Sequence, residues 1–322
     1  MISRRAVLRS IPIALGIPTR PRAAHAQEPG RTYRFGALFN SPRDAPQNVA
    51  FFDELRRAGF VDVRVDGFGL RTERFADFAR EFVQAKVDII MCGGDPAIRA
   101  AQQATATIPI LAVTDDMAGS GLIRSLSKPG GNTTGVSILA NQLDGKRQEI
   151  LIDMLPRVRR MAALVDPATT APRQFQALQD SARARGVKLS IHRIATPEGI
   201  VPAIEAAKKE GAAALNVLAT PLFFNSRRLI FARATALRLP GMYQWPEMAE
   251  EGGLAAYGPR IVQIFRELMT QQAVKLLRGA KPSDLPVEQP TRFELVINVK
   301  TAKALGVAIP PSVLHRADQL IE

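Results

Sequence analysis

The feature that most constrains this chain is an alternation of strand and helix patterns that begins near residue 33. Apolar runs typical of buried strands are separated by amphipathic stretches, whose apolar residues recur three or four positions apart. In order, they read "YRFGALF", "QNVAFFDELRRAG", "VDVRV", "ERFADFAREFVQAK", "VDIIMC", "PAIRAAQQATA" and "IPILAV". Strands that alternate with helices at this spacing predict an α/β architecture with a mainly parallel sheet.

The same order of patterns returns in the second half of the chain. It reads "RRMAALVDP", "PRQFQALQDSARARG", "VKLSIHR", "GIVPAIEAAKKEG", "AAALNVL", "SRRLIFARATALR" and "LPGMYQW". Gly59 and Gly186 close corresponding helices, and Pro109 and Pro240 open corresponding strands, at offsets of 127 and 131 residues. We therefore predict two copies of one doubly wound α/β lobe rather than a solenoid, whose repeats are much shorter.

Three extended segments link the halves and predict a hinge. The first contains "NTTGVSI" and leads into a helix over about residues 142–155, and the other two flank a long helix over about 260–278. The chain then ends in two short helices broken by Pro310 and Pro311. The expected division is lobe 1 at residues 31–135 plus about 258–287, and lobe 2 at residues 136–257 plus about 288–322.

The first 26 residues are typical of an export signal. A basic stretch, "MISRRAVLRS", precedes the short apolar run "IPIALGIP" and an A-x-A site that predicts cleavage after about Ala26. The stretch "SRRAVLR" also resembles a twin-arginine signal, so both the general secretory and the twin-arginine route stay open. The apolar run is far shorter than the roughly 20 residues that span a bilayer. We expect a soluble, periplasmic protein.

Charge and cysteine content narrow the class of partner. The net charge is +13, but five arginines lie in residues 1–26, which leaves 38 basic and 30 acidic residues and a net charge of +8. There is no dense Lys/Arg run with interleaved aromatics, which disfavours a nucleic-acid partner. Cys92 is the single cysteine, which excludes an intrachain disulfide and a multi-cysteine metal site. We expect a monomer that needs no cofactor and no metal.

An enzyme needs a catalytic constellation, and the sequence offers little for one. No H-E-x-x-H, C-x-x-C, G-x-S-x-G or G-x-x-x-x-G-K-[ST] pattern occurs. We expect His192, within a strand, and His315, within a surface helix, to be structural. Asp115 and Asp116 are adjacent, and neighbouring residues on an extended chain point to opposite faces. Shared catalysis by this pair is therefore disfavoured, and we expect no enzyme activity.

Binding is favoured instead, because ligands of open α/β sheets collect outside the carboxyl ends of the strands. Those ends are rich in Asn, Ser, Thr, Asp and Pro, and they read "FNSPRD", "CGGDPA", "VTDDMA", "VDPATT", "LATPLFFN" and "YQWPE". If the two lobes face each other across a hinge, these loops line one cleft.

The turn "GGDP" at residues 93–96 permits two interpretations. Glycines at 93 and 94 allow a close backbone approach, Asp95 can cap the next helix, and Pro96 suits its first position. The exposed N–H groups of that helix could receive a ligand carboxylate. Asp95 would repel an anion and could instead pair with a ligand ammonium. A purely structural cap is the alternative.

Aromatic residues on the second-half loops are candidate ligand contacts, because Tyr and Trp combine a flat apolar face with a polar edge. We expect Tyr243 and Trp245 to contact a ligand, with Phe223 and Tyr257 as further candidates. Phe224 is expected in the core. Lys146 and Arg147, at the start of the inter-lobe helix, are expected to be solvated.

The whole of residues 31–322 resembles a known family, the periplasmic substrate-binding proteins of ABC transporters, in the tryptophan/tyrosine-type branch. The stretches that carry the resemblance are "GGDPAIRAAQQATATIPI", "GSGLIRSLSKPGGNTTGVS", "LDGKRQEIL", "EGGLAAYGP" and "DLPVEQPTRFELVINVKTAKALGVAIP". It implies a periplasmic-binding-protein type I fold: two doubly wound parallel-sheet lobes, a three-segment hinge and closure like a Venus flytrap.

The resemblance also implies which turns bind ligand. The matching positions are Asn40, Ser41, Gly94, Asp95, Pro96, Thr114, Asp115, Asp166, Tyr243 and Trp245. Where this chain has Asp95 the family commonly has a hydroxyl residue, so carboxylate binding does not transfer directly to that turn. The implied function is an exported receptor that passes a small amino-acid-like, aromatic or carboxylic ligand to ABC permease subunits, its sole link to the membrane. The alternative is an extracytoplasmic ligand sensor that signals to a membrane partner.

Overall fold

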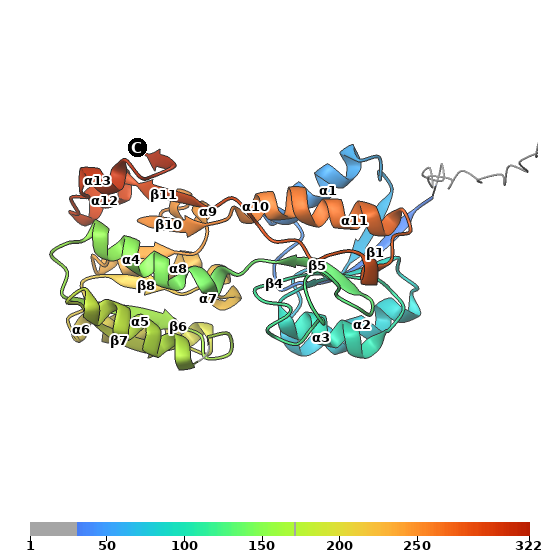
Figure 1. Cartoon of the computed structure of the whole chain (residues 1–322), viewed down its shortest axis with the longest axis horizontal. Coiled ribbons are helices and arrows are strands. Elements are labelled where there is room, and N and C mark those ends of the chain that lie inside the picture. Colours follow the sequence, from blue (N-terminus) through green and yellow to red (C-terminus); the bar gives the residue numbers. More distant parts are fainter. Residues whose placement is uncertain (1–30, 171) are drawn as a thin grey trace, which may run out of the picture.

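The computed structural model describes residues 31–170 and 172–322, so the predicted export signal lies outside the described residues. The described chain forms two α/β lobes arranged end to end along the long axis (Figure 1). Within this part of the chain, none of the helices combines the length and the apolar character that crossing a membrane requires.

Lobe 1 is built on a five-stranded sheet in which every pairing is parallel, in the order β2-β1-β3-β4-β5. Its strands are β1 (Tyr33–Leu38), β2 (Val63–Asp66), β3 (Ile89–Gly93), β4 (Ile110–Thr114) and β5 (Thr133–Ser137). The helices of its first half are α1 (Pro46–Arg57), the short η1 (Thr72–Arg74), α2 (Phe75–Gln84) and α3 (Asp95–Ala104). Apolar side chains at helical spacing, such as Phe75, Ala79 and Phe82 of α2, pack these helices onto the sheet.

Lobe 2 contains a seven-stranded sheet in the order β12-β11-β10-β9-β8-β6-β7. Its strands are β6 (Arg160–Val165), β7 (Lys188–Arg193), β8 (Leu215–Val217), β9 (Gly241–Tyr243), β10 (Ala255–Gly258), β11 (Glu294–Asn298) and β12 (Gln319–Ile321). The five strands β6 to β10 lie in the order β7-β6-β8-β9-β10, which repeats the order of lobe 1, and they are all parallel. Only β11 pairs antiparallel with β10 and carries β12 at the edge of the sheet.

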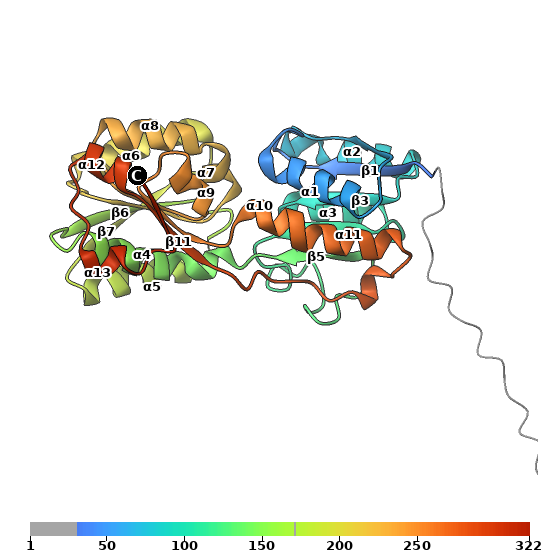
Figure 2. The same ribbon diagram turned by 90° about the horizontal axis from the view of Figure 1, so that it is seen from above.

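The helices of lobe 2 cover both faces of this sheet (Figure 2). They are η2 (Ala140–Leu143), α4 (Asp144–Met154), α5 (Pro172–Ala184), η3 (Pro197–Gly199), α6 (Ile200–Lys209), α7 (Pro221–Asn225), α8 (Arg227–Ala236), α9 (Pro246–Glu250), α12 (Val299–Leu305) and α13 (Pro311–Leu314). The predicted pair of terminal helices corresponds to α12 and α13. The short α7, α9 and β12 were not expected from the sequence.

The predicted duplication is confirmed at the level of single residues. Gly59 and Gly186 both follow a helix with a positive φ, of 99° and 70°, the left-handed conformation that favours glycine. The carbonyls of Pro109 and Pro240 accept equivalent hydrogen bonds from the third strand of each lobe. The α/β class and the two parallel-sheet lobes follow from this repeated pattern of strands, helices and turn residues.

Three segments cross between the lobes (Figures 1 and 2). The first leads from β5 into η2 and α4, and the second leads from β10 into a helical rod. That rod consists of α10 (Ile261–Gln263), a π-helical stretch η4 (Ile264–Met269) and α11 (Thr270–Leu277), and it lies against α1 of lobe 1. The third crossing runs from η5 (Pro282–Asp284) to β11.

The third crossing is bonded to the end of the lobe 1 sheet. Glu288 exchanges two backbone hydrogen bonds with β5, from its N–H to Gly135 O and from Ser137 N–H to its own carbonyl, each 2.9 Å long. Gly135 itself has a φ of +142°, and a Cβ there would lie 1.8 Å from the carbonyl oxygen of Ala112. β5 extends to Ser137, two residues past the predicted end of lobe 1.

Candidate functional site

The directions of the strands bring the two sets of carboxyl ends toward each other. The first crossing leaves lobe 1 from the carboxyl end of β5, and the second leaves lobe 2 from the carboxyl end of β10. We call the region between the lobes, which the three crossings span, the waist. Because the strands from β1 to β5 and from β6 to β10 are parallel within each lobe, all of their carboxyl ends point toward it. The loops at these ends are the candidate site (Figure 1).

The rim of lobe 1 contains the Gly-Gly-Asp-Pro turn between β3 and α3. Gly94 has a φ of +85° and is the N-cap of α3, so Asp95 is the first helical residue and not the cap. A hydrogen bond from the hydroxyl of Thr114, at the end of β4, reaches one carboxylate oxygen of Asp95. Asp95 is half-buried and Pro96 is exposed. The carboxylate is therefore held at the rim, where it also complements the positive end of the helix.

A second loop of this rim contains Asn40 and Ser41, after β1. The exposed Asn40 donates a 2.7 Å hydrogen bond from its amide to Leu70 O, which ties two loops together. Ser41 Oγ accepts a 3.2 Å hydrogen bond from the buried Asn48. Both predicted site residues thus have structural partners within lobe 1, and their contact with a ligand stays a prediction.

The rim of lobe 2 repeats the aspartate–threonine pairing. Asp166 follows β6, and its Oδ2 accepts a 2.8 Å hydrogen bond from the hydroxyl of Thr220, which follows β8. Its Oδ1 accepts a 2.9 Å hydrogen bond from the backbone N–H of Ala168. Both Asp166 and Thr220 are buried. Thr220 also caps α7 through Leu222 N–H, and sequence reasoning missed it.

The aromatic candidates lie mainly in the core of lobe 2. Phe223, Tyr243 and Trp245 are 0%, 2% and 6% exposed. The ring of Tyr243 packs edge-on against Phe231, with centroids 4.9 Å apart, and burial raises the pKa of its hydroxyl. These positions give the three residues a packing role, and their role in ligand contact remains untested.

Of the two phenylalanines of α7, Phe223 lies in the core, and Phe224, which was expected there, is only partly buried against it. Phe223 is fully buried, whereas Phe224 is half-buried beneath the guanidinium of Arg227, 4.6 Å from its ring centroid. Tyr257 is partly exposed on β10, with its ring centroid 6.5 Å from that of Phe293 on the third crossing. Tyr257 therefore lies at the waist itself.

Asp115 is bonded to the hinge. Its Oδ1 accepts a 3.1 Å hydrogen bond from Asn141 N–H, and its carbonyl accepts bonds from Leu139 N–H and Ser137 Oγ on the first crossing. Burial raises the pKa of its carboxyl to about 6, against the backbone hydrogen bonds that lower it. The carboxylate of Asp116 turns elsewhere and accepts from Gly119 N–H, so the two aspartates do not form a catalytic pair.

Arg147 fastens the waist, and the expectation that it is solvated is wrong. Its side chain is 0% exposed. Nε donates to Tyr257 O at 2.7 Å, Nη1 donates to Ala140 O and to Asp144 Oδ1 at 2.8 Å, and Nη2 donates to Gln244 O at 3.3 Å. One guanidinium thus joins η2, where the first crossing enters lobe 2, to β10, where the second crossing leaves it, and to the loop after β9.

The charge of Arg147 is balanced by Asp144, one turn earlier on α4. Asp144 Oδ1 also accepts a 3.2 Å hydrogen bond from Ala219 N–H at the end of β8. Burial raises the pKa of Asp144 to about 7, although the guanidinium opposes that shift. The spacing of Asp144, Arg147, Leu151 and Met154 puts all four on one buried face of α4. That spacing was the signal that could have identified the pair from sequence, whereas Lys146, on another face, is half-exposed.

The remaining titratable residues offer no assembled reaction centre. In residues 31–170 and 172–322, no group of three or more His, Cys, Asp or Glu side chains is arranged to hold a metal ion. His192 contacts Ser190 at 3.1 Å and Glu210 at 3.5 Å on the outer strand β7, and His315 ends α13. Cys92 is buried in β3, and burial raises the pKa of its thiol.

The chain is similar to one described family and to a curated protein. The model of the family described as ABC transporter substrate binding protein matches residues 66–321. The tyrosine-binding protein of Clostridioides difficile (strain R20291) is 28% identical over 235 residues, which is 71% of this chain. The match covers 66% of that relative, so this chain spans just under two thirds of the relative's length.

Solved structures share the architecture. A structure from Streptococcus pneumoniae, described as an ABC domain in complex with L-Trp, has a TM-score of 0.79 at 23% identity and covers 90% of this chain and 100% of its own. The ligand-free, open structure of a substrate binding protein with adhesive properties from Clostridium difficile has a TM-score of 0.60 at 23% identity, covering 90% and 99%. At these identities the likeness concerns the fold, and the predicted type I periplasmic-binding architecture is confirmed.

Replacement of Arg147 tests the fastening of the waist. We expect Arg147→Met to lower the free energy of unfolding by about 3–5 kcal/mol, because Asp144 is left as a buried charge without its partner. The matched change Lys146→Met, at a half-exposed neighbour, should cost less than about 0.5 kcal/mol. Urea denaturation followed by circular dichroism measures both. Equal losses in the two variants would contradict a structural role for the buried guanidinium.

Replacement of Asp115 tests the buried carboxyl at the hinge. In the folded chain it keeps its proton up to about pH 6, against an ordinary value of 3.8. The folded state therefore binds more protons in this window, so the free energy of unfolding falls as pH rises from about 4 to 6. Asp115→Asn should flatten that fall by up to about 3 kcal/mol, whereas Gln142→Ala, which changes an exposed and uncharged side chain of the first crossing, should keep the wild-type slope. Urea denaturation across this pH range measures the free energy of unfolding. If its dependence on pH is the same in Asp115→Asn as in wild type, Asp115 does not have a raised pKa.

Proposed function

The chain belongs to the ABC transporter substrate-binding protein family, and from this premise we propose that it is an exported, periplasmic receptor that captures an amino acid between its lobes and delivers it to a membrane permease. The observation that carries the proposal is the pair of facing rims, each with an aspartate held by a threonine hydroxyl. A ligand that touches both rims adds contacts only when the lobes approach, and so favours the closed state.

The chemistry of the rims favours a zwitterion over a simple anion. Asp95 and Asp166 contribute a carboxylate on each side, and carboxylates pair with an ammonium group. At the N-terminus of α3, a ten-residue helix, the N–H groups of Asp95 and Ala97 can bind the carboxylate of a ligand whose ammonium group offsets the charge of Asp95, whereas Pro96 has no N–H. An α-amino acid carries both groups on one carbon. Aromatic amino acids are the first candidates, because relatives are named for tyrosine and solved with L-Trp.

Ligand capture is tested with a panel of amino acids and matched acids. We expect L-tyrosine or L-tryptophan to raise the melting temperature and to bind by isothermal titration calorimetry, because a ligand bound only by the folded state stabilises it by about 2.7 kcal/mol at 100 times Kd. Small-angle scattering should show a smaller radius of gyration with the ligand. Chemical turnover of a bound amino acid, or binding with no change in scattering, would contradict a closing receptor.

The charge of Asp95 is expected to set ligand preference. Asp95→Thr removes the carboxylate but keeps an oxygen at the rim, so affinity for a zwitterionic amino acid should fall about tenfold or more while affinity for the matched acid without the amino group rises. Asp284→Asn, which removes an exposed carboxylate from η5, outside the rim loops, is the charge-matched control. Equal affinities for both ligand classes in wild type and Asp95→Thr would remove Asp95 from the site.

A further inference from the structure

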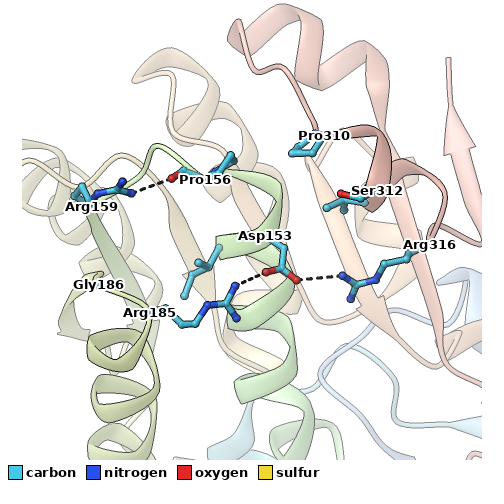
Figure 3. A pocket seen from close by; sticks show the side chains of 10 residues that line it. Asp153, Pro156, Arg159, Arg185, Gly186, Pro310, Ser312 and Arg316 are labelled. Atoms are coloured by element: carbon cyan, nitrogen blue, oxygen red, sulfur yellow. Dashed lines mark hydrogen bonds and ion pairs between the residues drawn. The ribbon is translucent and has the colours of Figure 1, made fainter.

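A cavity lies at the end of lobe 2 that is remote from the waist (Figure 3). It has a volume of about 720 Å³. Its walls are the C-terminal end of α4, the segment after α5, and the segment of residues 310–316. α4 begins at the first crossing and runs about 16 Å along the lobe, so the cavity is at the amino ends of β6 and β7, opposite the candidate amino-acid site.

Positive charge dominates the lining of this cavity. Arg159, Arg185 and Arg316 line it, and Asp153 is the one carboxylate among the lining residues. Asp153 lies between two of them: it accepts from Arg185 at 2.5 Å and from Arg316 at 3.1 Å (Figure 3). These guanidinium groups lower the pKa of Asp153, although its partial burial acts in the opposite direction.

Among the described residues, the third arginine, Arg159, forms its hydrogen bonds to backbone carbonyls and not to a carboxylate. Arg159 Nη1 donates to Pro156 O at 2.9 Å and to Val158 O at 3.2 Å, both close in sequence. Each guanidinium carries five N–H donors, so a single carboxylate and two carbonyls leave donor capacity in the group of three. The side chains of Arg185 and Arg316 are 45% and 46% exposed, so a solute can reach them.

The helix ends at this cavity reduce its positive charge without cancelling it. α4 and α5 both end here, and each helix C-terminus acts as roughly half a negative charge. Three guanidinium groups against Asp153 and two helix ends leave about one net positive charge. The arginines therefore compensate the negative helix ends and still leave positive charge at the cavity.

The cavity also has some apolar surface. It comes mainly from the exposed Pro156 and the half-buried Pro310, because Ile152 and Val313, which also line the cavity, are only 7% and 2% exposed. A cavity of this volume falls within the range of small-molecule sites, which combine apolar walls with a few fixed polar groups. Hydrated inorganic ions gain little from this apolar surface, whereas an organic anion gains from it and from the arginines.

We propose that this cavity binds a small organic anion with at least two negative charges, such as a dicarboxylate or a phosphomonoester. The planar guanidinium groups of Arg159 and Arg316 bind its anionic oxygens in the forked geometry that carboxylate and phosphate share. Its carbon skeleton lies against Pro156 and Pro310. Because α4, the end of α5 and the C-terminal segment all line the site, an occupant links three segments of lobe 2.

The test uses the full protein with succinate and glycerol 3-phosphate as dianions and acetate as the monovalent reference, at fixed ionic strength. Calorimetry should detect at least one dianion, with acetate at least tenfold weaker. Arg159→Gln should weaken dianion binding at least tenfold. The matched control Arg183→Gln removes an exposed arginine of α5 that pairs with Asp180 and does not line the cavity, and it should bind like wild type.

Separate readouts keep the proposal distinct from the amino-acid site and from simple misfolding. Asp95→Thr should leave dianion binding unchanged, so a failed receptor assignment would not affect this result. In the folded wild type, the side-chain Nε–H resonances of Arg159 and Arg316 should shift with the dianion, while that of Arg183 stays in place. No binding of either dianion, equal weakening in Arg159→Gln and Arg183→Gln, or resonance shifts spread over all arginines would overturn the proposal.

Discussion

The buried guanidinium of Arg147 is the constraint on which the lobe 2 side of the waist depends. A guanidinium without solvent must donate to nearby oxygens, and here those oxygens belong to η2, where the first crossing enters lobe 2, to β10, where the second crossing leaves it, and to the β9 loop. Removing any of these segments from its place would leave a charge unsatisfied in the interior. The cost of such a charge makes the geometry of the waist specific, in a way that apolar packing alone does not.

Apolar contacts complete the waist on the side of lobe 1. Ile261, Ile264 and Phe265 belong to one buried cluster that extends from the lobe 1 core into the lobe 2 core. Phe265 also packs edge-on against Phe39 at the end of β1, with centroids 6.0 Å apart. The helical rod is thus packed against α1 and β1 of lobe 1.

How much the sequence could predict depends on whether the signal was local. The α/β class, the duplication and the family resemblance were confirmed, because periodicity and the glycines and prolines at matched positions are local properties. The prediction that Arg147 is solvated was wrong. Arginine is usually solvated, and the carbonyls that bind this one come from residues about 100 positions away. Phe224, which was expected in the core, is only partly buried against it, because successive side chains on a helix point about 100° apart and Phe223 takes the buried direction.

The rims and the first crossing are joined by hydrogen bonds between neighbouring residues. Thr114 holds Asp95 at the lobe 1 rim, and the next residue, Asp115, holds Asn141 on the first crossing. Asn141 in turn donates to Thr169, whose N–H is bonded to the carbonyl of Asp166 at the lobe 2 rim. In the proposed receptor, a ligand bound to Asp95 or Asp166 would therefore act on residues bonded to the crossing. The end of β4 carries both Thr114, which holds Asp95, and the strand end next to Asp115, which holds the first crossing.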